Sequence, residues 1–209
     1  MKLTKLTSVL VLAGSSVFGQ YKMEPAAALP ENLPAVLTPL LLKQGTRIVG
    51  PDGVFCEIWF RSTPPPATAV KEDSVTLTGV AHGAFMGVIR FPSRGYDRRG
   101  QSVNPGLYTL RLSFFPQNGD HQGVAPQRDF LLLSPIADDP DPSLTPNFDT
   151  LSALSKKASG TPHPAVLSMW KADIEFKPGF EKLGDSDWVL QLKVAGTPIA
   201  VVVVGKAEG

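Results

Sequence analysis

Residues 188–204, WVLQLKVAGTPIAVVVV, decide the fold class of this chain. From residue 188 to residue 194 apolar and polar side chains alternate, which is typical of a strand with one buried face. Residues 195–198 (AGTP) favour a turn, and residues 199–204 are apolar at every position. A strand that is apolar on both faces belongs inside a sheet rather than at its edge. The stretch therefore predicts a hairpin whose second strand is central.

Working outward, the rest of the chain shows more short apolar runs separated by proline and glycine. The 20 prolines and 19 glycines are about a fifth of the 209 residues, against a usual share of roughly 12%. Such punctuation is typical of all-β proteins. Further strands are predicted at residues 54–61, 75–80, 85–91, 107–115, 127–134 and 173–176. The pattern predicts an all-β fold, mainly an antiparallel β-sandwich that is immunoglobulin-like or jelly-roll-like, over residues 35–209.

One short helix is predicted near residues 148–158. Its apolar stripe consists of Phe148, Leu151, Leu154 and Ala158. Asn147 can cap the first turn, and Gly160 follows the last turn.

The first 34 residues read differently from the rest. Residues 1–19 combine a cationic start, a short apolar run and small residues before Gln20, which predicts a secretory signal peptide. Residues 20–34 are rich in proline and alanine and are predicted to form an extended tether. The protein is therefore expected to be exported, to the periplasm or the extracellular space. No apolar run reaches the length of a transmembrane segment.

Charge and cysteine content limit the kinds of partner and of side-chain chemistry to expect. A formal net charge of +1 gives no reason to expect nucleic acid as a partner. Cys56 is the only cysteine, so no internal disulfide can form. It alternates with Val54, Ile58 and Phe60, which predicts a buried, unreactive side chain.

A resemblance supports the same class. Residues 104–112, NPGLYTLRL, resemble the PGxYxLxL element of secreted β-sandwich modules, including carboxypeptidase regulatory-like and transthyretin-like folds. In that element Tyr108 packs inward and its hydroxyl reaches a partner. A longer stretch, from Gly87 to Phe130, is similar to secreted bacterial proteins that have no established activity. The resemblance implies secretion and a β-sandwich, and it implies no catalytic residue.

The loop at residues 116–126, PQNGDHQGVAP, is the most site-like segment. Its two glycines let the backbone present Asp120 and His121, and Arg128 and Asp129 follow at the next strand. Together these four side chains could bind a carboxylate-bearing or sugar ligand. The alternative is a structural loop in which Asp120 caps a turn and Arg128 pairs with a neighbouring aspartate.

Two metal sites are weaker hypotheses. His82, His121 and His163 each lie in a loop rich in glycine or proline, and three imidazoles that meet could hold zinc or copper. No local spacing joins any two of them, so the alternative is three separate histidines. A second group, Asp138, Asp139 and Asp141, could bind calcium or form a solvated acidic loop.

These observations favour a non-catalytic binding module for a small molecule, glycan or protein, with no required cofactor. The sequence shows no GxSxG elbow and no phosphate-binding loop. The first alternative is a metal-binding protein or metal-dependent enzyme that uses the loop histidines. The second is a structural component of the cell envelope. Trp59, on the face opposite Cys56, is a candidate exposed ligand contact.

Overall fold

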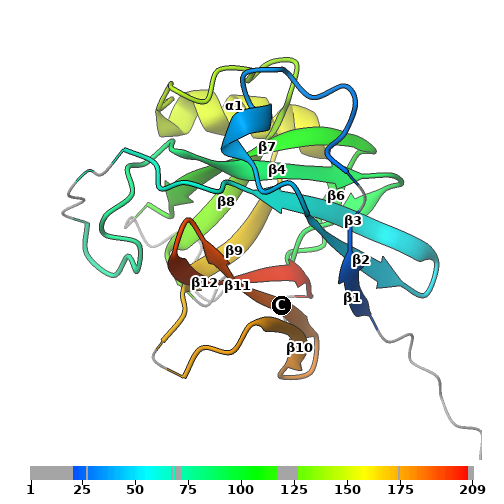
Figure 1. The fold of residues 1–209 in the computed structure, drawn as a ribbon. Coiled ribbons are helices and arrows are strands. Elements are labelled where there is room, and N and C mark those ends of the chain that lie inside the picture. Colours follow the sequence, from blue (N-terminus) through cyan, green and yellow to red (C-terminus); the bar gives the residue numbers. More distant parts are fainter. Residues whose placement is uncertain are drawn as a thin grey trace, which may run out of the picture.

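A computed structural model describes residues 21–26, 28–66, 68, 72–116, 127–173 and 175–206 (Figure 1). Ten strands form one antiparallel sheet in the order β1-β2-β3-β4-β7-β8-β9-β12-β11-β10, and β5 pairs with β6. The strands are β1 Lys22–Pro25, β2 Thr46–Gly50, β3 Gly53–Phe60, β4 Phe85–Phe91, β5 Gly95–Tyr96, β6 Ser102–Val103, β7 Gly106–Phe114, β8 Asp129–Pro135, β9 Val166–Lys171, β10 Gly179–Leu183, β11 Asp187–Val194 and β12 Thr197–Val204. The described residues also form a 3-10 turn, η1 Thr38–Leu40, and one α-helix, α1 Phe148–Ser159. The predicted all-β class with one short helix is confirmed.

Strand β9 joins the two halves of the sheet. Its residues 166–168 pair with β8, whereas residues 169–171 pair with β12. Because one strand is shared in this way, the β9–β12–β11–β10 part turns across the β1–β8 part (Figure 1). The two edge strands β1 and β10 come into contact, and the ring of Tyr21 lies 5.9 Å from that of Trp188, centroid to centroid. The sheet therefore encloses its own core.

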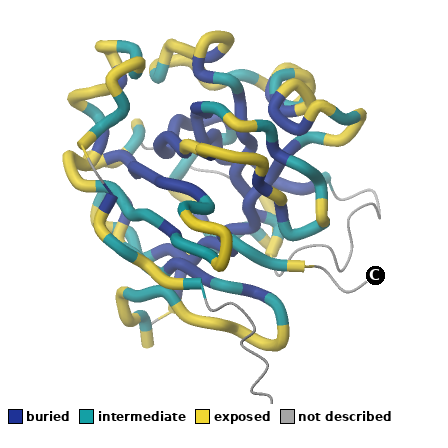
Figure 2. Tube along the Cα trace, turned by 90° about the vertical axis from the view of Figure 1, so that its right-hand side faces the viewer, coloured by how far each residue is buried: buried dark blue, intermediate teal, exposed yellow. Residues whose placement is uncertain are grey.

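The core lies between these halves, where the tube in Figure 2 is mostly dark blue. Cys56 is fully buried there, as predicted, and burial raises the pKa of its thiol well above the ordinary value. Tyr108 also packs inward as expected, and its hydroxyl donates a 2.7 Å hydrogen bond to the backbone carbonyl of Asn104. Strand β12 lies between β9 and β11, so the predicted central strand is confirmed.

A second apolar layer covers the outer face of the sheet. Leu37 and Leu41, from the segment after β1, pack there against Trp59, Phe85 and other side chains. Trp59 is 1% exposed, so the interpretation of this residue as a surface contact was wrong. The interpretation of residues 20–34 as a tether also needs correction, because β1 pairs with β2 and Ala26 packs in the second layer. The folded domain therefore begins before residue 35.

Other predictions were confirmed in part. Helix α1 begins after Asn147, whose side chain accepts a hydrogen bond from the Thr150 amide, and ends at Gly160 in the left-handed conformation, with φ 67°. The strand predicted at residues 54–61 forms as β3, which pairs with β2. Residues 75–80 and the described part of 173–176 form no strand, while β9 and β10 were not predicted. Among the described residues, no helix is both long and apolar enough to span a membrane.

Candidate functional site

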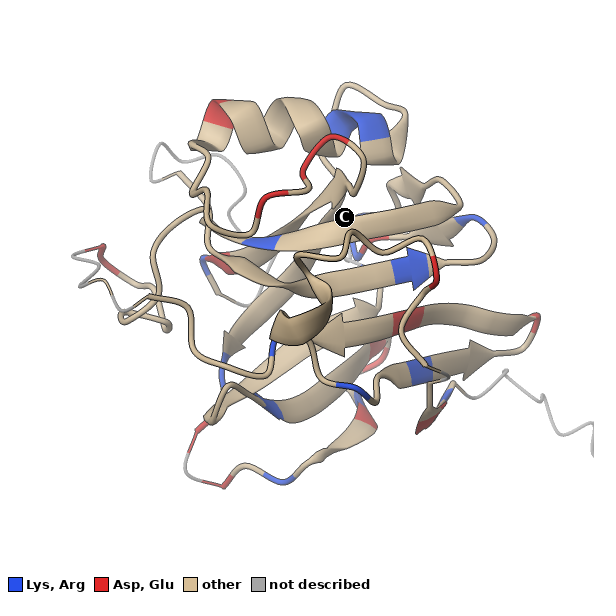
Figure 3. Cartoon of the chain, turned by 45° about the horizontal axis from the view of Figure 1, so that its top comes forward, with Lys and Arg blue, Asp and Glu red and all other residues tan. Residues whose placement is uncertain are grey.

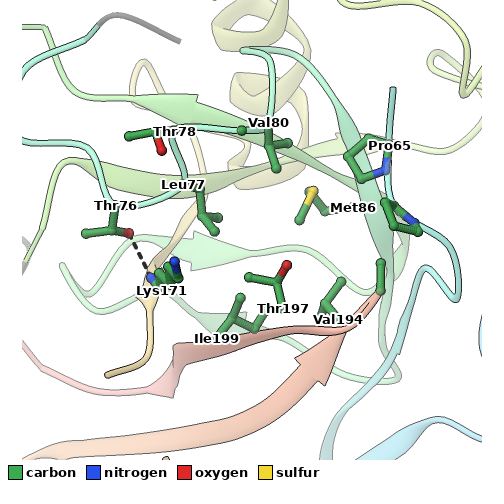
Figure 4. A pocket seen from close by; sticks show the side chains of 13 residues that line it. Pro65, Thr76, Leu77, Thr78, Val80, Met86, Lys171, Val194, Thr197 and Ile199 are labelled. Carbon is green, nitrogen blue, oxygen red and sulfur yellow. Dashed lines mark hydrogen bonds between the residues drawn. The ribbon is translucent and has the colours of Figure 1, made fainter. Parts of the chain in front are cut away.

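A cavity of about 260 Å³ lies at one end of the enclosed core (Figure 4). Its floor comes from strands β9, β11 and β12, one wall from β4 and the prolines after β3, and its roof from residues 76–80. The lining residues are Pro64, Pro65, Thr76, Leu77, Thr78, Gly79, Val80, Met86, Lys171, Val194, Ala195, Thr197 and Ile199. In Figure 4, Leu77 and Val80 approach from above the space that Thr197 and Ile199 approach from below. The cavity is thus an unfilled continuation of the apolar core.

Strand alternation explains why the floor residues face the cavity. Ile199 and Val201 belong to the enclosed core, so Thr197, two residues before Ile199, lies on the same face of β12. Thr197 is the register partner of Val194, and Ile199 is the register partner of Lys171. The last core-facing positions of three adjacent strands therefore meet at this opening.

A β-bulge in β4 brings Met86 into the wall. The register with β7 shifts between Phe85 and Gly87, which leaves Met86 as the extra residue. Phe85 packs in the outer layer while Met86 packs in the enclosed core. Gly87 is needed beside the bulge, because a Cβ atom there would lie 2.5 Å from the Trp59 carbonyl oxygen. The close approach of β3 thus fixes the position of the wall.

The roof is held by side-chain hydrogen bonds instead of a strand ladder. The carboxylate of Asp129 accepts the amides of Thr76 at 2.8 Å and Leu77 at 3.0 Å. The Thr76 hydroxyl oxygen in turn accepts the backbone amide of Lys171 at 2.7 Å. Residues 75–80 alternate like a strand but cannot pair next to β4, because β3 and β7 occupy both of its edges. This corrects the strand predicted there.

Ala195 occupies an unfavourable backbone conformation at the cavity. It has φ 51°, and the following Gly196 has φ 87°, in the two-residue turn between β11 and β12. Two-residue hairpin turns with positive φ at both positions favour Asn-Gly, because alanine in this region costs about 1–2 kcal/mol. Ala195 lines the cavity. A larger side chain at this position would therefore compete with a ligand for space.

The four ligand-binding residues predicted from the sequence divide into two pairs. Asp120 and His121 lie outside the described residues. Asp129 is fully buried and holds the roof, so its carboxylate is occupied by backbone amides. Arg128 donates hydrogen bonds to the carbonyls of Phe115 and Asp73 and pairs with Glu72. Arg128 and Asp129 thus both hold residues 72–77, Arg128 at the start of this segment and Asp129 where it becomes the roof.

A wider, open cavity of about 680 Å³ brings two of the predicted residues together. Arg128 and His82 both line it, with Glu72, Phe114 and Phe148 among the other residues. The Nε2 atom of His82 lies 2.9 Å from the hydroxyl oxygen of Ser113, which is fully buried. Burial lowers the pKa of His82, while a hydrogen bond to the backbone of Pro146 and the charge of Glu72 act in the opposite direction.

This shift predicts a pH dependence of stability. Since the pKa of His82 is lower in the folded state, the unfolded chain takes up the proton first as pH falls. The contribution of His82 to the free energy of unfolding should be at its maximum above about pH 6.5, the pKa of histidine in the unfolded chain. It should decline as pH falls below that value. His82→Gln should flatten the free energy of unfolding between pH 7 and 5, measured by urea titration. The exposed His163 is the control, and an equal flattening in His163→Gln would contradict the assignment.

The three histidines do not assemble one metal site from the described residues. His82 hydrogen-bonds to Pro146, before the start of α1, and the His163 carbonyl accepts the hydroxyl of Ser159, the last residue of α1. The twelve-residue helix separates these contacts by roughly 17 Å at its usual rise. His82 and His163 therefore cannot bind the same ion, and His121 lies outside the described residues. Among the residues described, no group of three His, Cys, Asp or Glu side chains could hold a metal.

The aspartates of the proposed calcium loop also have separate partners. Asp138 pairs with Lys157 at 3.0 Å, and Asp141 accepts the Ser143 amide and hydroxyl. Asp139 is buried and pairs with Arg111. The loop is neither a calcium site nor wholly solvated in this structure. In Figure 3, acidic and basic residues are distributed over different strands and loops of the fold.

Comparisons with protein-family models, curated proteins and solved structures found no match to this chain. The chemistry of the 260 Å³ cavity therefore follows from its own lining residues. Its lining, all of it within the described residues, contains apolar groups, threonine hydroxyls and one lysine, without an acid, histidine or cysteine. Such a site can bind and orient a ligand, but it offers no imidazole or carboxylate as a general base.

Proposed function

We propose that the protein is an exported binding module that holds a small, largely apolar ligand in the cavity beneath residues 76–80. The observation that carries this proposal is the unfilled end of the core, where apolar side chains meet a few hydroxyls. Small-molecule sites typically combine an apolar, concave lining with few polar groups. The roof supports the proposal, because a segment held by side chains can release more easily than a paired strand.

The cavity volume sets the size of the ligand. An apolar cavity of about 150 Å³ in a protein core can bind benzene. The volume of about 260 Å³ is therefore suited to a compact two-ring or branched aliphatic molecule. 2-Naphthol is a suitable neutral test compound, and ligand efficiencies of small molecules set an expected Kd on the order of 0.1 mM.

Two substitutions of Ala195 provide the test. Glycine and asparagine both tolerate the positive φ at position 195 better than alanine does. Of Ala195→Gly and Ala195→Asn, however, only the asparagine variant adds volume at the cavity. Both variants should melt at or above the native temperature, because alanine at this positive φ costs about 1–2 kcal/mol. Asparagine should weaken 2-naphthol binding at least tenfold in isothermal titration calorimetry, whereas glycine should preserve it. If 2-naphthol bound neither the native protein nor the glycine variant, the proposal would be refuted.

Export is the second part of the proposal and rests on the order of charge, apolar run and small residues in positions 1–19. The resemblance of residues 104–112 to secreted modules supports it. Expression of the full chain with export should give a mature protein whose N-terminal sequence begins within a few residues of Gln20. A product that keeps Met1 and stays in the cytoplasm would contradict this part while leaving the cavity proposal intact.

A further inference from the structure

Lys171 occupies a position where β9 would otherwise present an apolar side chain to the core. Leu167 and Met169, at the same phase of the strand, belong to the enclosed core. Lys171 continues that face at the end of the strand. It lines the cavity beside Ile199, its register partner on the adjacent strand β12. Its exposed side chain therefore places an ammonium group at the mouth of an apolar site.

No described acidic group pairs with the Lys171 side chain, nor does the Thr197 hydroxyl hydrogen-bond to any described residue. Thr197 lies two positions from Ile199 on the same face of β12, so it is diagonal to Lys171 at about 7–8 Å between backbones. One carboxylate can span that separation and accept hydrogen bonds from both groups. The carboxylate of Asp129 does not line the cavity, because it is directed to the amides of the roof.

We infer that the ligand is a compact apolar monocarboxylate, with its hydrocarbon body in the cavity and its carboxylate between Lys171 and Thr197. This inference rests on the proposed function and adds the charge of the ligand. The apolar body replaces the missing end of the core, and the charged group remains at the mouth, where it keeps part of its hydration. A positively charged ligand would instead meet the Lys171 ammonium.

The test compares two molecules of the same ring size. 2-Naphthoate carries a carboxylate at pH 7, whereas 2-naphthol is neutral. The native protein should bind 2-naphthoate roughly tenfold more tightly, as expected for a charge-assisted hydrogen bond. Lys171→Met should remove this preference and leave 2-naphthol binding unchanged, while Lys171→Arg should keep most of it. Lys193→Met is the matched control, because Lys193 is exposed on β11 and does not line the cavity.

The possible results separate the two levels of the proposal. Equal binding of both compounds by the native protein would overturn the carboxylate inference but support an apolar binding module. The same would follow if Lys193→Met weakened 2-naphthoate binding as much as Lys171→Met, since only the overall charge would then matter. Binding of neither compound, to the native protein or to Ala195→Gly, would refute the proposed function itself. Loss of the preference in Lys171→Met alone would support both.

Discussion

Asp139→Ala is expected to lower the free energy of unfolding by about 3–5 kcal/mol, because it leaves a buried arginine without its counter-charge. Arg111 is fully buried and its five N–H groups are all used. Two of them donate to Asp139, at 2.8 and 2.7 Å, and the other three donate to the carbonyls of Gly83, Leu144 and Asp141. Without the carboxylate, the positive charge of Arg111 would be buried in the interior with no counter-charge.

Asp138→Ala is the matched control for this prediction. Asp138 precedes Asp139 and also forms an ion pair, with Lys157, but both side chains are well exposed. An exposed pair of this kind contributes at most about 1 kcal/mol. Urea unfolding at pH 7 should therefore separate the two variants clearly. Similar losses in both would mean that the pair of Arg111 and Asp139 is not buried in solution as it is in this structure.

The β-strands with clean alternation or continuous apolar character were predictable from the sequence. Strands β4, β11 and β12 lie close to their predicted positions. In these strands the order of apolar and polar residues directly reflects which faces are buried. Strand β9 was missed, since residues 166–171 place serine and tryptophan among apolar residues and end in lysine. The pattern is irregular because the strand pairs with β8 at one end and with β12 at the other.

Residues 75–80 show the opposite failure. Their alternation is as regular as that of a true strand, yet they form the roof of the cavity. Local periodicity reports which side chains face the apolar interior, and Leu77 does face it, at 4% exposure. It cannot report that both edges of β4 are already paired. The same side-chain pattern therefore occurs both in a strand and in a segment held by the Asp129 carboxylate and by the hydrogen bond between Thr76 and Lys171.

The candidate cavity could be predicted from the sequence only in fragments. Met86 and Ala195 carry no recognisable signal, because one depends on a bulge and the other on a backbone angle. Lys171 could not be recognised without the register of β9. Asp129 was selected as a ligand-binding residue for its place beside the long loop, and the structure places it instead behind the roof. The remaining two members of that set, Asp120 and His121, stay predictions.

Asp129→Ala is expected to weaken both the fold and the cavity. The carboxylate is fully buried and accepts two backbone amides, and each hydrogen bond to a charged group contributes about 1.5–3 kcal/mol. Water can reach part of the freed backbone, so the free energy of unfolding should fall by about 2–4 kcal/mol. Without this anchor Leu77 should leave the core, and 2-naphthol binding should weaken more than tenfold, measured at a temperature at which the variant remains folded.

The combination of effects distinguishes an anchor from a ligand contact. If Asp129 touched the ligand directly, the alanine variant would lose binding while its melting temperature stayed near the native value. Asp129→Asn provides an intermediate, because one amide oxygen can still accept one of the two backbone amides at 76 and 77. Its stability and its affinity for 2-naphthol should both fall between those of the alanine variant and the native protein. Parallel changes across the three proteins would establish that Asp129 acts through the roof, whereas unchanged affinity in a clearly destabilised alanine variant would show that the roof does not form part of the binding site.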